Sequence, residues 1–112
     1  MDSSGHIVNR VIYSNLGICR GTPEPFNTGG SLGVIRYVVP YLLCGTIDNI
    51  GSDQEPGMII RFTATNCAGD SAIWSVIVNT GPLGPGERYP FNKRIGYSDP
   101  GSPCKVSARA YR

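Results

Sequence analysis

Charged residues, histidine and long apolar runs are all scarce in this sequence of 112 residues. Aspartate, glutamate, lysine and arginine make up 16% of the chain, below the roughly 25% of an average soluble domain. The formal net charge is only +2, and the basic residues are scattered along the chain. The dense cationic stripe of a protein that contacts nucleic-acid phosphates is missing, so we expect no nucleic-acid partner.

The apolar segments are too short to cross a membrane as a helix, which takes about 20 residues. The longest runs from Val38 to Cys44 and is interrupted by Pro40. Residues 1–6 have neither the basic nor the apolar stretch of a signal peptide, so none is expected there. We expect no membrane span.

Residues suited to catalysis are also few. The single histidine, His6, lies beside the N-terminus, where a general base would not be held in a fixed position. All eight carboxylates fall in predicted loops or in the N-terminal tail. The glycine-rich segment 29–33 lacks the flanking strand and helix of a phosphate-binding loop. We therefore expect no enzyme activity and no cofactor.

Glycine and proline, by contrast, are abundant, with 15 and 9 residues. Together with a hydrophobic content of 40%, this composition is typical of short strands joined by tight turns around a packed core. No window shows sustained helical periodicity. The period-two alternation of a strand occurs in residues 6–14, 33–44, 58–65, 72–78 and 104–110.

The alternation also predicts which side chains face the core. Ile60, Phe62 and Ala64 lie on one side of their strand, and Trp74 should anchor the core from the middle of a central strand. The turn residues 67–71 predict a hairpin between the two segments that carry these side chains.

Alternate residues of the segment 33–44 form another predicted apolar face. Pro40 lies on the opposite face of this segment. A proline within a strand indicates a sheet edge or a bulge. The residues of the apolar face are Ile35, Tyr37, Val39, Tyr41 and Leu43.

These patterns predict one β domain over residues 1–112. Its fold class is all-β, a small antiparallel sandwich or barrel of the immunoglobulin-like or jelly-roll-like kind.

Four cysteines, Cys19, Cys44, Cys67 and Cys104, are too widely spaced for the paired motifs of zinc sites. We expect two structural disulfides and an oxidising final environment, extracellular or at a virion surface. Four cysteines allow three pairings, and the spacing does not choose among them. Buried free thiols are the alternative.

An oxygen-rich segment, residues 48–55, is the weak candidate for a metal site. Asp48, Asn49, Asp53 and Glu55 supply the ligand atoms that Ca²⁺ prefers, but their spacing does not fit an EF-hand loop. A polar loop is the simpler interpretation, and we predict no metal.

The aromatic residues Tyr89, Phe91 and Tyr97 lie with Arg94 in a glycine- and proline-rich stretch. Loop aromatics beside polar groups can stack on sugars or on partner proteins, so these four are the candidate binding residues. They can equally fix a long loop to the sheet.

The segment 6–14 carries apolar residues of both parities, which suits a strand that is covered on both sides. Such a terminal strand can be added to the open sheet edge of a neighbouring copy, or it can be an ordinary first strand. The candidate assembly residues are Ile7, Val8, Val11, Ile12 and Tyr13.

Three functional classes remain open. The first is a non-enzymatic, self-assembling structural subunit of an extracellular filament, an appendage or a virion, whose partner is the chain itself. The second is a secreted binding module, such as a lectin or a protein inhibitor. The third is a small hydrolase or nuclease that uses loop carboxylates.

Overall fold

The computed structural model describes residues 4–27, 35–69, 71–101 and 103–111, and this part of the chain forms nine β-strands and no helix. It therefore holds no helix that is long and apolar enough to cross a membrane. The strands are β1 (Gly5–Val8), β2 (Val11–Arg20), β3 (Glu24–Asn27), β4 (Ile35–Val38), β5 (Tyr41–Asn49), β6 (Ile59–Thr65), β7 (Ala72–Asn79), β8 (Arg88–Gly96) and β9 (Lys105–Tyr111).

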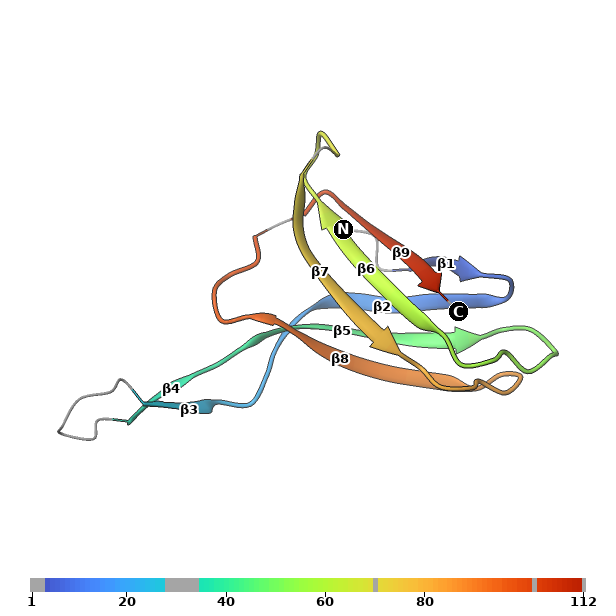
Figure 1. The fold of residues 1–112 in the computed structure, drawn as a ribbon, viewed down its shortest axis with the longest axis horizontal. Helices are drawn as coiled ribbons and strands as arrows, with labels where there is room; N and C mark the ends of the chain where they lie inside the picture. Colours follow the sequence, from blue (N-terminus) through green and yellow to red (C-terminus); the bar gives the residue numbers. More distant parts are fainter. Residues whose placement is uncertain (1–3, 28–34, 70, 102, 112) are drawn as a thin grey trace.

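The strands form two main sheets and a separate two-stranded ribbon, and all pairings are antiparallel (Figure 1). The four-stranded sheet has the order β1-β2-β5-β8, and the three-stranded sheet has the order β7-β6-β9. The three-stranded sheet lies across the four-stranded one, so the fold is an open sandwich rather than a closed barrel. The predicted all-β class is confirmed.

The core lies between the two sheets and is centred on Phe62 of β6. Its ring meets Tyr13 of β2 edge-on, with ring centroids 5.4 Å apart, and stacks on Phe91 of β8 at 5.3 Å. The alternation of β6 explains this arrangement, because Ile60, Phe62 and Ala64 are all fully buried. The inward face predicted for this strand is confirmed.

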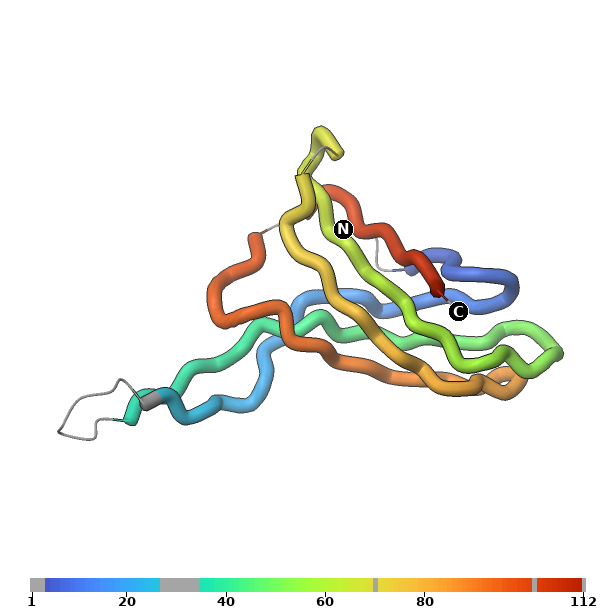
Figure 2. The backbone as a smooth tube through the Cα atoms, in the orientation of Figure 1, coloured from blue at the N-terminus to red at the C-terminus, as the bar shows by residue number. Residues whose placement is uncertain are grey.

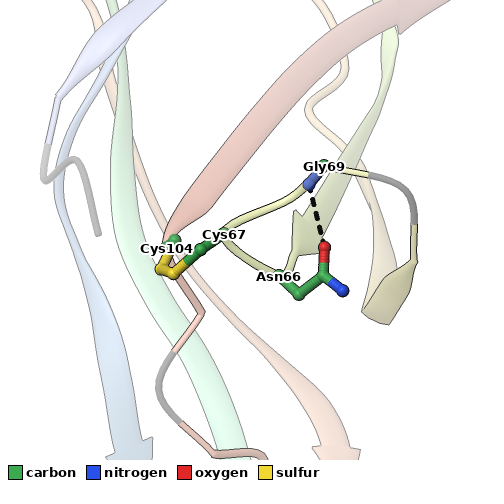
Figure 3. Close-up of a disulfide and its surroundings, with 4 residues drawn as sticks. All are labelled: Asn66, Cys67, Gly69 and Cys104. Carbon is green, nitrogen blue, oxygen red and sulfur yellow. Dashed lines mark hydrogen bonds between the residues drawn. A yellow bond between two sulfur atoms is a disulfide. The ribbon is translucent and has the colours of Figure 1, made fainter.

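The predicted hairpin between β6 and β7 is also confirmed, and a disulfide ties its turn to the start of β9 (Figure 3). Cys67 and Cys104 are paired, with their Cα atoms 4.9 Å apart. Gly69 has a φ of 76° and donates its N–H to Asn66 Oδ1 at 2.9 Å. The turn thus uses glycine where the backbone enters the left-handed region.

The second disulfide joins neighbouring strands of the four-stranded sheet. Cys19 of β2 and Cys44 of β5 are paired, with their Cα atoms 6.1 Å apart. The expectation of two disulfides is confirmed, and the sheet pairings select one of the three connectivities that the spacing left open.

Two of the predicted strands are wrong in extent. The segment 6–14 is divided into β1 and β2 by a turn at Asn9 and Arg10, where Asn9 adopts a φ of 49°. The segment 33–44 is broken at Val39 and Pro40 into β4 and β5, which fits the proline signal; residues 33 and 34 lie outside the described part.

Two strands were not predicted from the pattern at all, β3 and β8. Each contains a proline, Pro25 or Pro90, which weakens a strand signal. Trp74 is buried as predicted, but it lies on β7, an edge strand of its sheet, and not on a central one.

Candidate functional site

The candidate assembly residues near the N-terminus take part in the chain's own hairpin. β1 pairs with β2, and His6 Nε2 lies 2.5 Å from the carbonyl oxygen of Asn9 in the connecting turn. Val11 and Tyr13 are buried in the core, and Ile7 and Val8 pack against it. Ile12 is half-buried and pairs with His6. A single chain therefore uses this segment as an ordinary first hairpin.

The candidate binding residues belong to β8 and the residue after it, not to a loop. Phe91 is a core residue and Tyr89 packs against the core, so neither ring forms an open stacking platform. The guanidinium carbon of Arg94 lies 5.3 Å from the centre of the Tyr97 ring, and Arg94 forms an ion pair with Glu24. The four residues do not form one site.

The side chains of Asp48 and Asn49 are already used within the fold. Asp48 accepts hydrogen bonds from Ser14 Oγ at 3.1 Å and from Arg88 Nε at 2.8 Å. Asn49 is buried, and its Nδ2 donates to the backbone oxygens of Asp53 at 2.8 Å and Leu83 at 3.1 Å. These bonds fix the loop after β5.

The remaining two metal candidates lie on the same loop. Asp53 is exposed, and Glu55 is buried and pairs through its backbone with Leu83. Both line a hollow of about 510 Å³ beside Asn9 and Arg10. Among the residues that the structure describes, no three His, Cys, Asp or Glu side chains gather as a metal site would require.

The most distinctive feature of the surface is a two-stranded arm, formed by β3 and β4, which projects from the sandwich (Figure 2). The arm continues the β2–β5 hairpin beyond a bend. Across the bend the pairing shifts by one residue, from Arg20 opposite Tyr41 to Glu24 opposite Val38. Such a shift bends a hairpin and exchanges the faces of its strands.

The arm exposes its large apolar side chains. Phe26, Ile35 and Tyr37 are 54%, 59% and 70% exposed. Ile35 and Tyr37 were predicted to share one apolar face with Leu43; Leu43 is buried, whereas Ile35 and Tyr37 are exposed because no second sheet within the described residues covers the arm. A two-stranded hairpin without such cover is marginally stable in water.

The two faces of the arm differ in charge. Residues opposite each other in a sheet point to the same side, so Pro25 and Tyr37 share one face with Ile35. This face, defined here as the apolar arm face, carries no charged side chain among the described residues. The other face carries Phe26 opposite Arg36.

The base of the arm, unlike its faces, is firmly tied to the sandwich. These contacts join the two strands where the arm leaves the sandwich, and one of them joins β3 to β8, but none covers the apolar side chains of the arm. They are the Cys19–Cys44 disulfide, the hydrogen bond from Gly21 N to Pro40 O at 2.9 Å, the hydrogen bond from Arg20 Nη2 to Val39 O at 3.1 Å, and the ion pair of Arg94 with Glu24.

A second apolar surface lies on the outer face of the three-stranded sheet. Ile59, Ile77 and Tyr111 are each between 44% and 49% exposed, and with Arg61 they line a hollow of about 270 Å³. A neighbouring hollow of about 300 Å³ also borders Ile59 and Tyr111. These residues lie at the start of β6 and at the ends of β7 and β9, and those strand ends point away from the arm (Figure 1). We call this surface the outer-face hollow.

Comparisons of the chain with protein-family models, with curated proteins and with solved structures found no match. The function is therefore argued from the chemistry of these surfaces. The arm was missed in the sequence because β3 has a weak strand pattern, and because alternation does not show that β4 lacks a covering sheet among the described residues.

Proposed function

We propose that this protein is a non-enzymatic structural subunit that assembles with copies of itself, as a component of an extracellular filament, an appendage or a virion. The observation that carries the proposal is the arm, which is held firmly at its base and presents an uncovered apolar face. Removing apolar surface from water gains about 25 cal/mol per Å². Docking the arm on another molecule supplies the cover that its own chain lacks.

The partner proposed for the arm is a second copy of the chain, and the surface proposed to receive it is the outer-face hollow. Both surfaces are apolar and both are uncovered in one chain. The aromatic ring of Tyr37 can also lie over the guanidinium of Arg61, a favourable cation–π arrangement.

The positions of the two surfaces favour an extended assembly. Because the strand ends that carry the hollow point away from the arm (Figure 1), we expect no chain to place its arm in its own hollow. Each copy offers one arm and one hollow, so the contact is heterologous. Contacts of this kind close into rings or continue as filaments, which is why a structural role is proposed.

The fixed base makes such docking favourable. An arm whose direction is already set loses little conformational freedom when it binds. Two disulfides are also compatible with an extracellular location or a virion surface. The net charge of +2 leaves little long-range repulsion between copies.

The test compares two isoleucines of matched exposure. Ile35 on the apolar arm face is 59% exposed, and Ile50 in the loop after β5 is 57% exposed. The double variant Ile35→Lys/Tyr37→Lys should lose assemblies larger than a dimer in sedimentation velocity, because burying lysine in an apolar contact is costly. Ile50→Lys, the control, should assemble as the wild type does.

Two results contradict the proposal. One is a wild-type protein that remains monomeric or dimeric at millimolar concentration. The other is an arm variant that forms the same large assemblies as Ile50→Lys. Unfolding curves of both variants, measured in parallel, separate a loss of assembly from a loss of folding.

A further inference from the structure

Three of the four edges of the two main sheets carry features that hinder strand addition. β1 is only four residues long. The edge strand β8 contains Pro90 and the cations Lys93 and Arg94, and the edge strand β9 contains Lys105 and Arg109. Short strands, proline and charge are the usual means by which proteins block pairing at an open edge.

The fourth edge, β7, has none of these features. Its eight residues, Ala72–Asn79, include no charged residue, no proline and no glycine. The pairing of β7 with β6 has a register shift between Ala72 and Trp74; from Ile73 onward the side chains alternate, with Trp74, Val76 and Val78 buried and Ile73, Ser75 and Ile77 exposed. A long, uncharged edge strand with exposed isoleucines is a template for another strand.

The start of this edge borders a hollow of about 250 Å³ rather than a neighbouring strand. Ile73 and Trp74 line one side of the hollow, and Gly96, Ser98 and Pro100, at the end of β8 and after it, are among the residues of the other side. An incoming strand needs only the usual spacing of about 4.8 Å from its neighbour.

From this contrast we infer that β7 pairs antiparallel with β7 of a second copy, across a two-fold axis at Ser75, and so joins the two three-stranded sheets into one. This inference rests on the self-association proposed above, but it uses the β7 edge and not the arm; Ile77 belongs both to β7 and to the outer-face hollow. The result is a symmetric dimer, which arm contacts then link into larger assemblies.

The sequence of β7 is self-complementary in this register. With Ser75 opposite Ser75 of the second copy, Ile73 lies opposite Ile77 of that copy, and Ile77 lies opposite its Ile73. On the inner side Trp74 lies opposite Val76 of the second copy. Pairs of β-branched residues and pairs of an aromatic with a β-branched residue are the favourable cross-strand combinations.

The distribution of charge also favours β7, rather than β8 or β9, as the edge at which two copies meet. The edges β8 and β9 are cationic in every copy, so bringing two such edges together sets like charges against each other. The uncharged β7 edge avoids this repulsion. Its match to itself, rather than to an arbitrary strand, identifies the occupant as a second copy of this chain.

The test uses two serines that flank the same residue. Ser75 of β7 and Ser107 of β9 both lie opposite Thr63 of the central strand β6, and both are exposed. Each also makes one long hydrogen bond to Thr63, of 3.4 and 3.5 Å. A lysine at either position therefore lies on the three-stranded sheet at the level of Thr63. Ser75→Lys places it on the β7 edge and Ser107→Lys places it on the β9 edge.

The experiment is carried out in the Ile35→Lys/Tyr37→Lys chain, so that arm contacts are removed. Sedimentation equilibrium should give a dimer for this chain. Adding Ser75→Lys should weaken the dimer at least about tenfold, since two lysines then meet at the axis. Adding Ser107→Lys should leave the dissociation constant unchanged.

A cysteine variant tests the register without relying on a loss of binding. Opposite residues of an antiparallel pair have Cα atoms about 4.5–5.5 Å apart, which is within disulfide range. Ser75→Cys should therefore form a covalent dimer under oxidation, and Ser107→Cys should remain monomeric on the same non-reducing gel.

The outcomes separate the two proposals. An arm variant that is monomeric, with Ser75→Cys not cross-linked, overturns β7 pairing, while assembly of the wild type still supports the arm. A Ser75→Lys chain that dimerises as before also overturns β7 pairing. Conversely, a wild type that forms the Ser75-dependent dimer and nothing larger supports β7 pairing and contradicts the arm.

Discussion

The sandwich and the arm are built from similar strands but bury their side chains very differently. In β6 of the sandwich, Ile60 and Phe62 are fully buried, whereas in β4 of the arm Ile35 and Tyr37 are more than half exposed. Both strands have apolar residues at alternate positions, Ile35 and Tyr37 in β4 and Ile60 and Phe62 in β6. Alternation of apolar residues therefore specifies a strand and its two faces, whereas a second layer of secondary structure decides whether a face is buried.

The largest predicted difference between the sandwich and the arm is the loss of stability when one aromatic ring is truncated in each. Phe62→Ala should lower the free energy of unfolding by about 3–5 kcal/mol, because it leaves a cavity where the ring contacts Tyr13 and Phe91. Tyr37→Ala, the matched variant in the arm, should change it by less than about 0.5 kcal/mol. Urea denaturation of dilute protein measures both, and equal losses would contradict the comparison.

Removing each disulfide separately gives a smaller but more specific contrast. The Cys19–Cys44 bond spans 25 residues and the Cys67–Cys104 bond spans 37. The chain-entropy model gives a loss of about 3–4 kcal/mol for either bond when both of its cysteines are replaced by serine. Since only the first bond lies at the base of the arm, Cys19→Ser/Cys44→Ser should also weaken assembly.

Sedimentation velocity of folded protein, at a temperature where both disulfide variants are native, distinguishes the two effects. Cys67→Ser/Cys104→Ser is the control, and it should assemble as the wild type does. If both variants assemble equally, the first disulfide does not set the direction of the arm.

Most of the sandwich was predictable because its signal is local. The inward faces of β6 and β7 follow from the alternation of apolar residues within each strand. The turn residues at positions 67–71 predict that the two strands pair as a hairpin. The expectation of disulfides came from cysteine spacing alone. The pairing itself was not predictable, since it depends on which strands become neighbours.

The candidate site was less predictable because it depends on long-range features. The order of strands in the sheets is not encoded in any one segment, so the edge position of β7, and of Trp74 on it, was not foreseen. β8 was missed because a strand with one face in solvent tolerates Pro90 and Lys93. Tyr37 is exposed because, among the described residues, no second sheet covers the arm, and alternation within β4 does not show whether a covering sheet is present.

The central claim, that the arm is uncovered in one chain and is covered by another copy, is tested most directly by amide hydrogen exchange as a function of protein concentration. Amides of β4, residues 35–38, should exchange rapidly in dilute protein, because the hairpin lacks a core of its own. They should become protected at concentrations where the chains assemble, while the amides of β6 remain equally slow throughout. Arm amides that are already protected in the dilute monomer, or that stay unprotected in the assembled protein, would contradict the account.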